Sequence, residues 1–185
     1  MREREVLNRA VTEIPTTLAW RLYQTPLSVH EPDLDSLAAI DIHVLVLGSD
    51  IRAPVGVEWA IARRTQQLPT LFLKSGILRT QAAQAFEREL ARFAEWKPYQ
   101  SIAELKQRFQ LLVGRHLLSR REHFKLGDAE YSRLNEWLNQ TGKSDARNED
   151  QILGGAGDSG VILSVERYMP SNGVLLSQVN DDPKE

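Results

Sequence analysis

The sequence contains no cysteine, and this absence excludes several chemistries at once. Without a thiol the chain can form no disulfide, no cysteine zinc site and no thiolate nucleophile. The histidines are scattered without the spacing typical of metal ligands, so we predict no metal site. They are His30, His43, His116 and His123. Because the composition fits a reducing compartment, we expect a cytoplasmic protein.

An excess of positive charge and a long apolar run are missing too. The formal net charge is −2 and the pI about 6.1, whereas a general nucleic-acid binder has a basic balance. No apolar run approaches the roughly 20 residues that span a bilayer. The opening residues, MREREVLNRAV, lack the pattern of a signal peptide. The sequence therefore favours neither a nucleic acid nor a membrane as partner.

Helical and strand patterns alternate in the first part of the chain. The predicted order is helix 2–14, strand 17–23, a short helix through Ala39, strand 42–47, a helix with Pro54 at its start, and strand 70–73. Such alternation predicts a parallel sheet with helices on its faces, and 185 residues suffice for its core.

Longer helices follow. Apolar spacing predicts helices 81–96, 101–118 and 128–139, with a small edge strand or a turn at 97–99. The polar, glycine-rich stretch 140–160 reads as a linker or mobile loop, 161–179 as a β-hairpin and 180–185 as a tail. We thus expect one α/β domain with a helical extension over 1–139, followed by these segments.

A candidate site follows the apolar strand 42–47. Gly48-Ser49-Asp50 makes a turn there, and Glu58 lies near the start of the next helix. Ligands bind outside the carboxyl ends of strands in open parallel sheets, so Ser49, Asp50 and Glu58 are predicted to lie where a small molecule is held.

The block from about Glu3 to Leu138 resembles TIR-like domains of bacterial signalling and defence proteins, and the nucleoside deoxyribosyltransferase-like superfamily that shares their architecture. The likeness rests on the order and spacing of short motifs. These are Arg2-Glu3-Arg4-Glu5, Asp41, Leu47-Gly48-Ser49, Val57-Glu58-Trp59-Ala60, Pro69 to Lys74, and Arg79-Thr80. The resemblance implies a flavodoxin-like or TIR-like parallel sheet with flanking helices, here with a helical extension and a C-terminal hairpin.

The resemblance also implies a function. In such enzymes a carboxylate at the position of Glu58 faces a ribose and helps to break an N-glycosidic bond, which makes Glu58 the catalytic candidate. Gly48, Ser49, Asp50 and Trp59 are the candidates for ligand binding, with NAD as a possible substrate or ligand and no cofactor required. Homo-oligomers are expected. The alternatives are a non-enzymatic self-associating interaction module and a nucleoside deoxyribosyltransferase.

Each candidate residue has a structural alternative. Glu58 could serve only the helix dipole, Asp50 only a turn or cap, and Trp59 only the core. His116 lies on the apolar face of its helix and reads as a hydrogen-bonded core histidine. The basic cluster Arg115, Arg120, Arg121, His123 and Lys125 could meet a phosphate or an acidic partner, or could be a solvated helix end.

The resemblance is incomplete in two places. Such domains usually begin with a strand that precedes the first helix, and this sequence has none there. Either the sequence starts late, or another segment fills the slot, for which the hairpin at 161–179 is the only spare β material. The glycine-rich run 154–160 has no lysine after its glycines, so it is not predicted to be a phosphate loop, and its Gly-Asp-Ser-Gly has no supporting protease motif.

Overall fold

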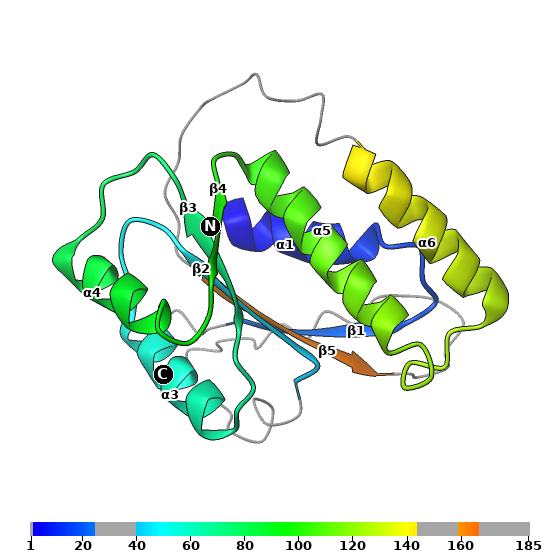
Figure 1. Ribbon diagram of the computed structural model, residues 1–185, viewed down its shortest axis with the longest axis horizontal. Helices are drawn as coiled ribbons and strands as arrows, with labels where there is room; N and C mark the ends of the chain where they lie inside the picture. Colours follow the sequence, from blue (N-terminus) through cyan, green and yellow to red (C-terminus); the bar gives the residue numbers. More distant parts are fainter. Residues whose placement is uncertain (1, 25–39, 144–158, 167–185) are drawn as a thin grey trace, which may run out of the picture.

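The computed structural model describes residues 2–24, 40–143 and 159–166, which form a mixed α/β structure around a five-stranded sheet (Figure 1). The strand order is β1 (Ala19–Gln24), β5 (Ser159–Glu166), β2 (Ile42–Leu47), β3 (Thr70–Lys74), β4 (Trp96–Tyr99). Strands β2, β3 and β4 are parallel, as the alternating pattern predicts. Strand β5 runs antiparallel to both of its neighbours.

Helices cover both faces of the sheet (Figure 1). One layer holds α1 (Arg2–Thr12), α5 (Ile102–Ser119) and α6 (Asp128–Lys143), and the other holds α3 (Ala53–Arg64) and α4 (Gln81–Leu90). Side chains alternate along a strand, so Val44 and Val46 of β2 pack with the first layer while Leu45 and Leu47 pack with the second. This double burial explains why β2 is apolar apart from His43.

Strand β5 fills the slot that the resemblance left open. It pairs with β1 from Ala19↔Glu166 to Gln24↔Val161, and with β2 from Ile42↔Leu163 to Val46↔Ser159. Within the described residues, a later segment thus lies in the middle of the sheet, between β1 and β2. Because β5 lies between β1 and β2, it is the strand that joins β1 to the parallel part of the sheet.

Several predicted boundaries need correction. Helix α4 ends at Leu90 rather than near residue 96, because Trp96 enters β4 and its indole Nε1 donates to the Glu87 carbonyl at 3.0 Å. Helix α6 runs on to Lys143 and β5 begins at Ser159, so the predicted linker 140–160 is too long at both ends. The short helix before Ala39, the second hairpin strand and the tail lie outside the described residues.

Local side chains set the helix starts. Pro54 lies in the first turn of α3, as predicted. Thr80 is the N-cap of α4 and accepts from the Ala83 amide at 3.2 Å. Ser101 caps α5 by accepting from the Glu104 amide at 3.1 Å, and the Glu104 carboxylate accepts from the Gln100 amide at 2.7 Å.

Candidate functional site

The turn at the carboxyl end of β2 is held by its own hydrogen bonds. Asp50 Oδ1 accepts from the Thr80 hydroxyl at 2.6 Å and from the Ile51 amide at 2.9 Å, and these bonds hold the pKa of Asp50 below its usual value. The Thr80 amide donates to the Ser49 carbonyl at 2.9 Å. Asp50 thus ties the β2 turn to the start of α4, which is the turn role weighed for it above; its ligand-binding role stays a prediction.

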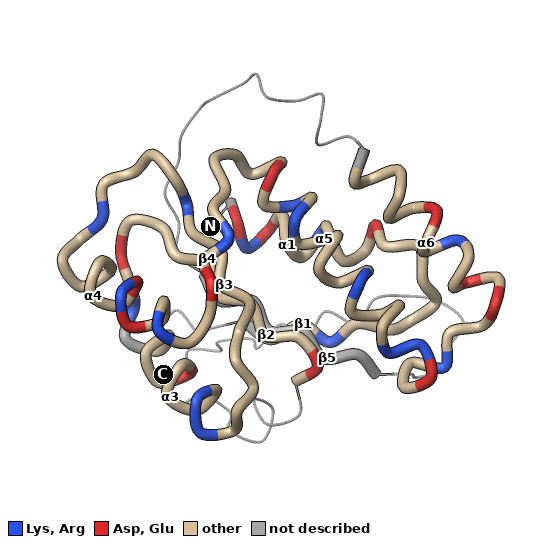
Figure 2. Tube along the Cα trace, viewed as in Figure 1, with Lys and Arg blue, Asp and Glu red and all other residues tan. Residues whose placement is uncertain are grey.

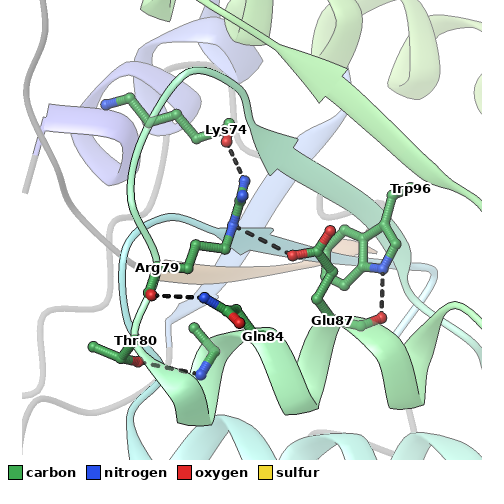
Figure 3. A network of polar contacts seen from close by, with 7 residues as sticks. Lys74, Arg79, Thr80, Gln84, Glu87 and Trp96 are labelled. Atoms are coloured by element: carbon green, nitrogen blue, oxygen red, sulfur yellow. Dashed lines mark hydrogen bonds and ion pairs between the residues drawn. The ribbon is translucent and has the colours of Figure 1, made fainter.

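A buried ion pair lies at the carboxyl end of β3, where the sequence offered only a lysine after an apolar strand. Lys74 Nζ lies 2.9 Å from Glu3 Oε1, and the two side chains are 5% and 1% exposed. Arg79 donates to the Lys74 carbonyl and lies 3.5 Å from Glu87 Oε2, as Figure 3 shows. These contacts fasten α1, the loop after β3 and α4 to one another.

A cavity of about 360 Å³ opens at the other end of the strands. It is bounded by the residues that enter β2, by the second half of α3, by the loop between α3 and β3, and by the end of α5. We call it the amino-end cavity. Its polar lining includes Asp41, His43, Glu58, Gln67, His116 and Arg120.

Glu58 is buried on the wall of this cavity, with 3% of its surface exposed. It lies in the second turn of α3, so it is not the first-turn residue that a dipole role would need. Burial and the charge of Arg52 lower the pKa of Arg4, while the negative charge of Glu58 opposes them. A buried carboxylate is costly without such an electrostatic partner.

The cavity groups Glu58 with residues from the amino ends of the strands rather than with Ser49 and Asp50. The geometry follows from the connection: α3 starts beyond the carboxyl end of β2 and runs back along it, and its residues Glu58, Ile61 and Ala62 line the cavity. Among the catalytic and ligand-binding candidates Gly48, Ser49, Asp50, Glu58 and Trp59, Glu58 is therefore the one that this cavity contains.

Two histidines line the cavity, and the pKa of each is lowered. Burial lowers the pKa of His43 to about 4, against an opposing hydrogen bond with the Gln67 backbone. Burial also lowers the pKa of His116, followed by the Arg120 charge, with Asp41 opposing and His123 adding a little. His116 Nε2 is buried and has no hydrogen-bond partner in the described part of the chain. The sequence predicts that His116 is a hydrogen-bonded core histidine, but its Nε2 makes no hydrogen bond within the described residues.

The members of the predicted basic cluster make different contacts. Figure 2 shows Lys and Arg along the lower half of α5 and in the turn that follows it. Arg121 pairs with Asp128 and lies 4.9 Å from the centre of the Tyr131 ring. His123 Nε2 lies 3.5 Å from Asp41 Oδ1. Arg120 is the member of the cluster that lines the cavity.

Trp59 belongs to the core between the sheet and the α3–α4 layer. It is 6% exposed, and its ring meets the Phe93 ring edge-on with centroids 5.4 Å apart. It is not among the residues that line the amino-end cavity. The structure therefore gives Trp59 a packing role, and ligand binding by it stays a prediction.

The cavity combines two carboxylates, of which Glu58 is buried, two imidazoles and a guanidinium. Its volume falls within the range of about 300–1,000 Å³ that is typical of small-molecule sites. A carboxylate accepts hydrogen bonds from sugar hydroxyls, an imidazole can donate or accept, and a guanidinium binds anions. Ionisable groups with shifted pKa values in a cavity make it a candidate functional site.

Two other kinds of site were sought in the same residues. Within residues 2–24, 40–143 and 159–166, no group of three or more His, Asp or Glu could hold a metal ion. Within those ranges no helix is long and apolar enough to cross a membrane.

Comparison with known proteins gives no family. No protein-family model, no curated protein and no solved structure matches the chain. The function must therefore be argued from the amino-end cavity itself.

Proposed function

We propose that the chain is a TIR-like nucleotide-binding module of the signalling or defence type, and that its ligand lies in the amino-end cavity against Glu58. The observation that supports this most is the burial of Glu58, 3% exposed, on the wall of a cavity of about 360 Å³. Even with the charge of Arg4 nearby, burying a carboxylate is costly, and ionisable groups that line a cavity are candidates for contact with a ligand.

The chemistry proposed for Glu58 is N-glycosidic bond cleavage. When a base departs from a ribose, positive charge develops on the sugar, and a nearby carboxylate stabilises that charge or attacks the sugar carbon. NAD is the first substrate to test, since departure of nicotinamide from its ribose is such a reaction.

The test is nicotinamide release from NAD, followed by chromatography over protein concentrations that span self-association. We expect release by the native chain and a loss of at least about 100-fold in Glu58→Gln, since a positioned carboxylate contributes on that scale. Asp50→Asn is the matched control, because its carboxylate is tied into the β2 turn. Undiminished turnover in Glu58→Gln contradicts the catalytic role. No release, together with no binding of NAD, contradicts the nucleotide-binding proposal itself.

A self-associating interaction module is the second candidate, and exposed apolar side chains favour it. Leu78, in the loop between β3 and α4, is 95% exposed, and Phe93 is 40% exposed. Sedimentation of Leu78→Ser tests this candidate: loss of self-association supports it, and an unchanged oligomer contradicts a role for this loop. Base exchange between deoxynucleosides in the same chromatographic assay would indicate a deoxyribosyltransferase, and no exchange of any base would dismiss one.

A further inference from the structure

We propose that Gln66 recognises the base of the ligand in the amino-end cavity, and that it selects a base edge on which a donor lies beside an acceptor, as in adenine. This rests on the proposed function, since it assumes that a nucleotide occupies the cavity with its ribose at Glu58. Three features of Gln66 support the assignment: its backbone conformation, its place on the cavity wall and the chemistry of its side chain.

Gln66 follows the end of α3 in a backbone conformation that favours glycine. Its φ is 58°, in the left-handed region, and the Gln67 amide closes the turn around it by donating to the Ala62 carbonyl at 3.0 Å. Glycine is the usual residue at this position of a helix end, because a side chain there costs free energy. Residues in such strained conformations concentrate at functional sites. A glutamine at this position therefore points to a role for its side chain.

Lys125 has the same backbone conformation and allows a comparison. Its φ is 49°, and the turn around it is closed by the Leu126 amide, which donates to the Arg121 carbonyl at 3.0 Å. Lys125 is exposed and does not line the amino-end cavity, whereas Gln66 lines it. The two positions thus share a conformation and differ in their relation to the cavity.

Gln66 continues the face of α3 that carries Glu58. Glu58, Ile61, Ala62 and Gln66 follow the spacing of one helical face, and all of them line the cavity. About 9 Å of helix separates Glu58 from the end of α3 at Arg64. A nucleoside is of similar length, so its base can reach Gln66 while its ribose lies against Glu58.

The loop between α3 and β3 offers both kinds of contact that a base needs. Gln66 is exposed, and its side-chain amide presents a donor and an acceptor side by side. Such an amide matches the amino group and a ring nitrogen of adenine with two hydrogen bonds. Leu68 also lines the cavity and is 44% exposed, so it offers an apolar surface to the face of the base. The loop therefore favours adenine over a purine that lacks the amino group.

Calorimetric titration of the full chain with adenosine and with purine riboside, which lacks the amino group, tests the proposal. We expect the native chain to bind adenosine about three- to tenfold more tightly, since a neutral hydrogen bond contributes on this scale. Gln66→Gly should remove this preference and, because it relieves the backbone strain, raise the melting temperature by about 2–4 °C. Lys125→Gly is the matched control: it should also raise the melting temperature, but leave the preference unchanged.

The outcomes separate this inference from the proposed function. If Gln66→Gly keeps the preference for adenosine, or if its melting temperature falls, Gln66 serves only the end of α3 and the inference is wrong. A native chain that binds the two nucleosides equally also contradicts it. Adenosine or NAD binding that is lost in Glu58→Gln would in each case still support the proposed function. If neither adenosine nor NAD binds, both proposals fail.

Discussion

The two ends of the sheet use their polar residues in opposite ways. At the carboxyl end of β2 the Thr80 hydroxyl donates to Asp50, and at the carboxyl end of β3 Lys74 pairs with Glu3. At the amino ends, Glu58 and two histidines line a cavity, and His116 Nε2 has no partner in the described structure. Ligands usually bind at the carboxyl ends of parallel strands. In this chain, internal contacts occupy residues at the carboxyl ends, and this is one reason why we propose the amino-end cavity as the ligand site.

The largest expected effect tests whether the carboxyl end is structural. Replacing Lys74 by Met leaves the Glu3 carboxylate buried without its cation, which should lower the free energy of unfolding by about 3–5 kcal/mol. Urea denaturation measures it. Lys106→Met is the matched control, because its pair with Glu13 is 33% and 48% exposed and should contribute at most about 1 kcal/mol. Equal losses in the two variants would contradict the assignment.

The next effect concerns the amino end and pH. The pKa of His43 is about 4 in the folded chain and near 6.5 when unfolded, so the unfolded state binds more protons between these values. Stability due to His43 is complete above pH 6.5 and is lost as the pH falls toward 4, by up to about 3 kcal/mol. Unfolding measured from pH 7 to 4 should show this loss, and His43→Gln should reduce it. If the free energy of unfolding of His43→Gln depended on pH as it does in the native chain, a group other than His43 would be responsible for the loss.

A smaller effect separates the two ends directly. Thr80→Ala removes the N-cap of α4 and the hydroxyl that bonds to Asp50, and should cost about 0.5–2 kcal/mol. Thermal unfolding checks this. Ligand affinity should not change, since Thr80 does not line the amino-end cavity. If Thr80→Ala also weakened ligand binding, the carboxyl ends of the strands would be part of the ligand site.

The smallest effect is expected at Gly56, on a helix that lines the cavity, and it is best compared with the same change at Gly114. A Cβ at Gly56 of α3 meets no atom within 4 Å, so Gly56→Ala should stabilise the chain by about 0.5–1 kcal/mol. At Gly114 of α5 a Cβ would lie 2.7 Å from Leu138 Cδ2, and the same change should destabilise by about 1–3 kcal/mol. Chemical denaturation should show an increase in the free energy of unfolding for Gly56→Ala and a decrease for Gly114→Ala. If Gly114→Ala also increased it, α6 would have moved away from α5 without loss of stability.

Local patterns were sufficient to predict most elements. The apolar run 42–47 became β2 at the predicted bounds, and Pro54 and Ser101 marked helix starts, because these signals depend only on neighbouring residues. The place of β5 depends on pairing between segments more than a hundred residues apart. The resemblance indicated that a later segment could take the place of the missing first strand. It did not indicate that this strand would run antiparallel to both of its neighbours.

The site was predictable only in part. Glu58 was singled out from its place after a strand and a glycine turn, but its grouping with Ser49 and Asp50 assumed that the turn and the helix face the same end of the sheet. His43, His116 and Arg120 come from separate elements, and no spacing along the sequence links them to Glu58. Their meeting results from packing of α3 and α5 around the start of β2.

The most direct test of the central claim is an amide NMR titration of the full chain with AMP. If the ligand occupies the amino-end cavity, the amide signals of residues 40–43 and 66–70 should shift together and saturate, and Glu58→Gln should weaken this response. The signals of residues 48–51 and 79–81 should move little. Shifts confined to 48–51 and 79–81 would contradict the account and return the site to the carboxyl ends of the strands.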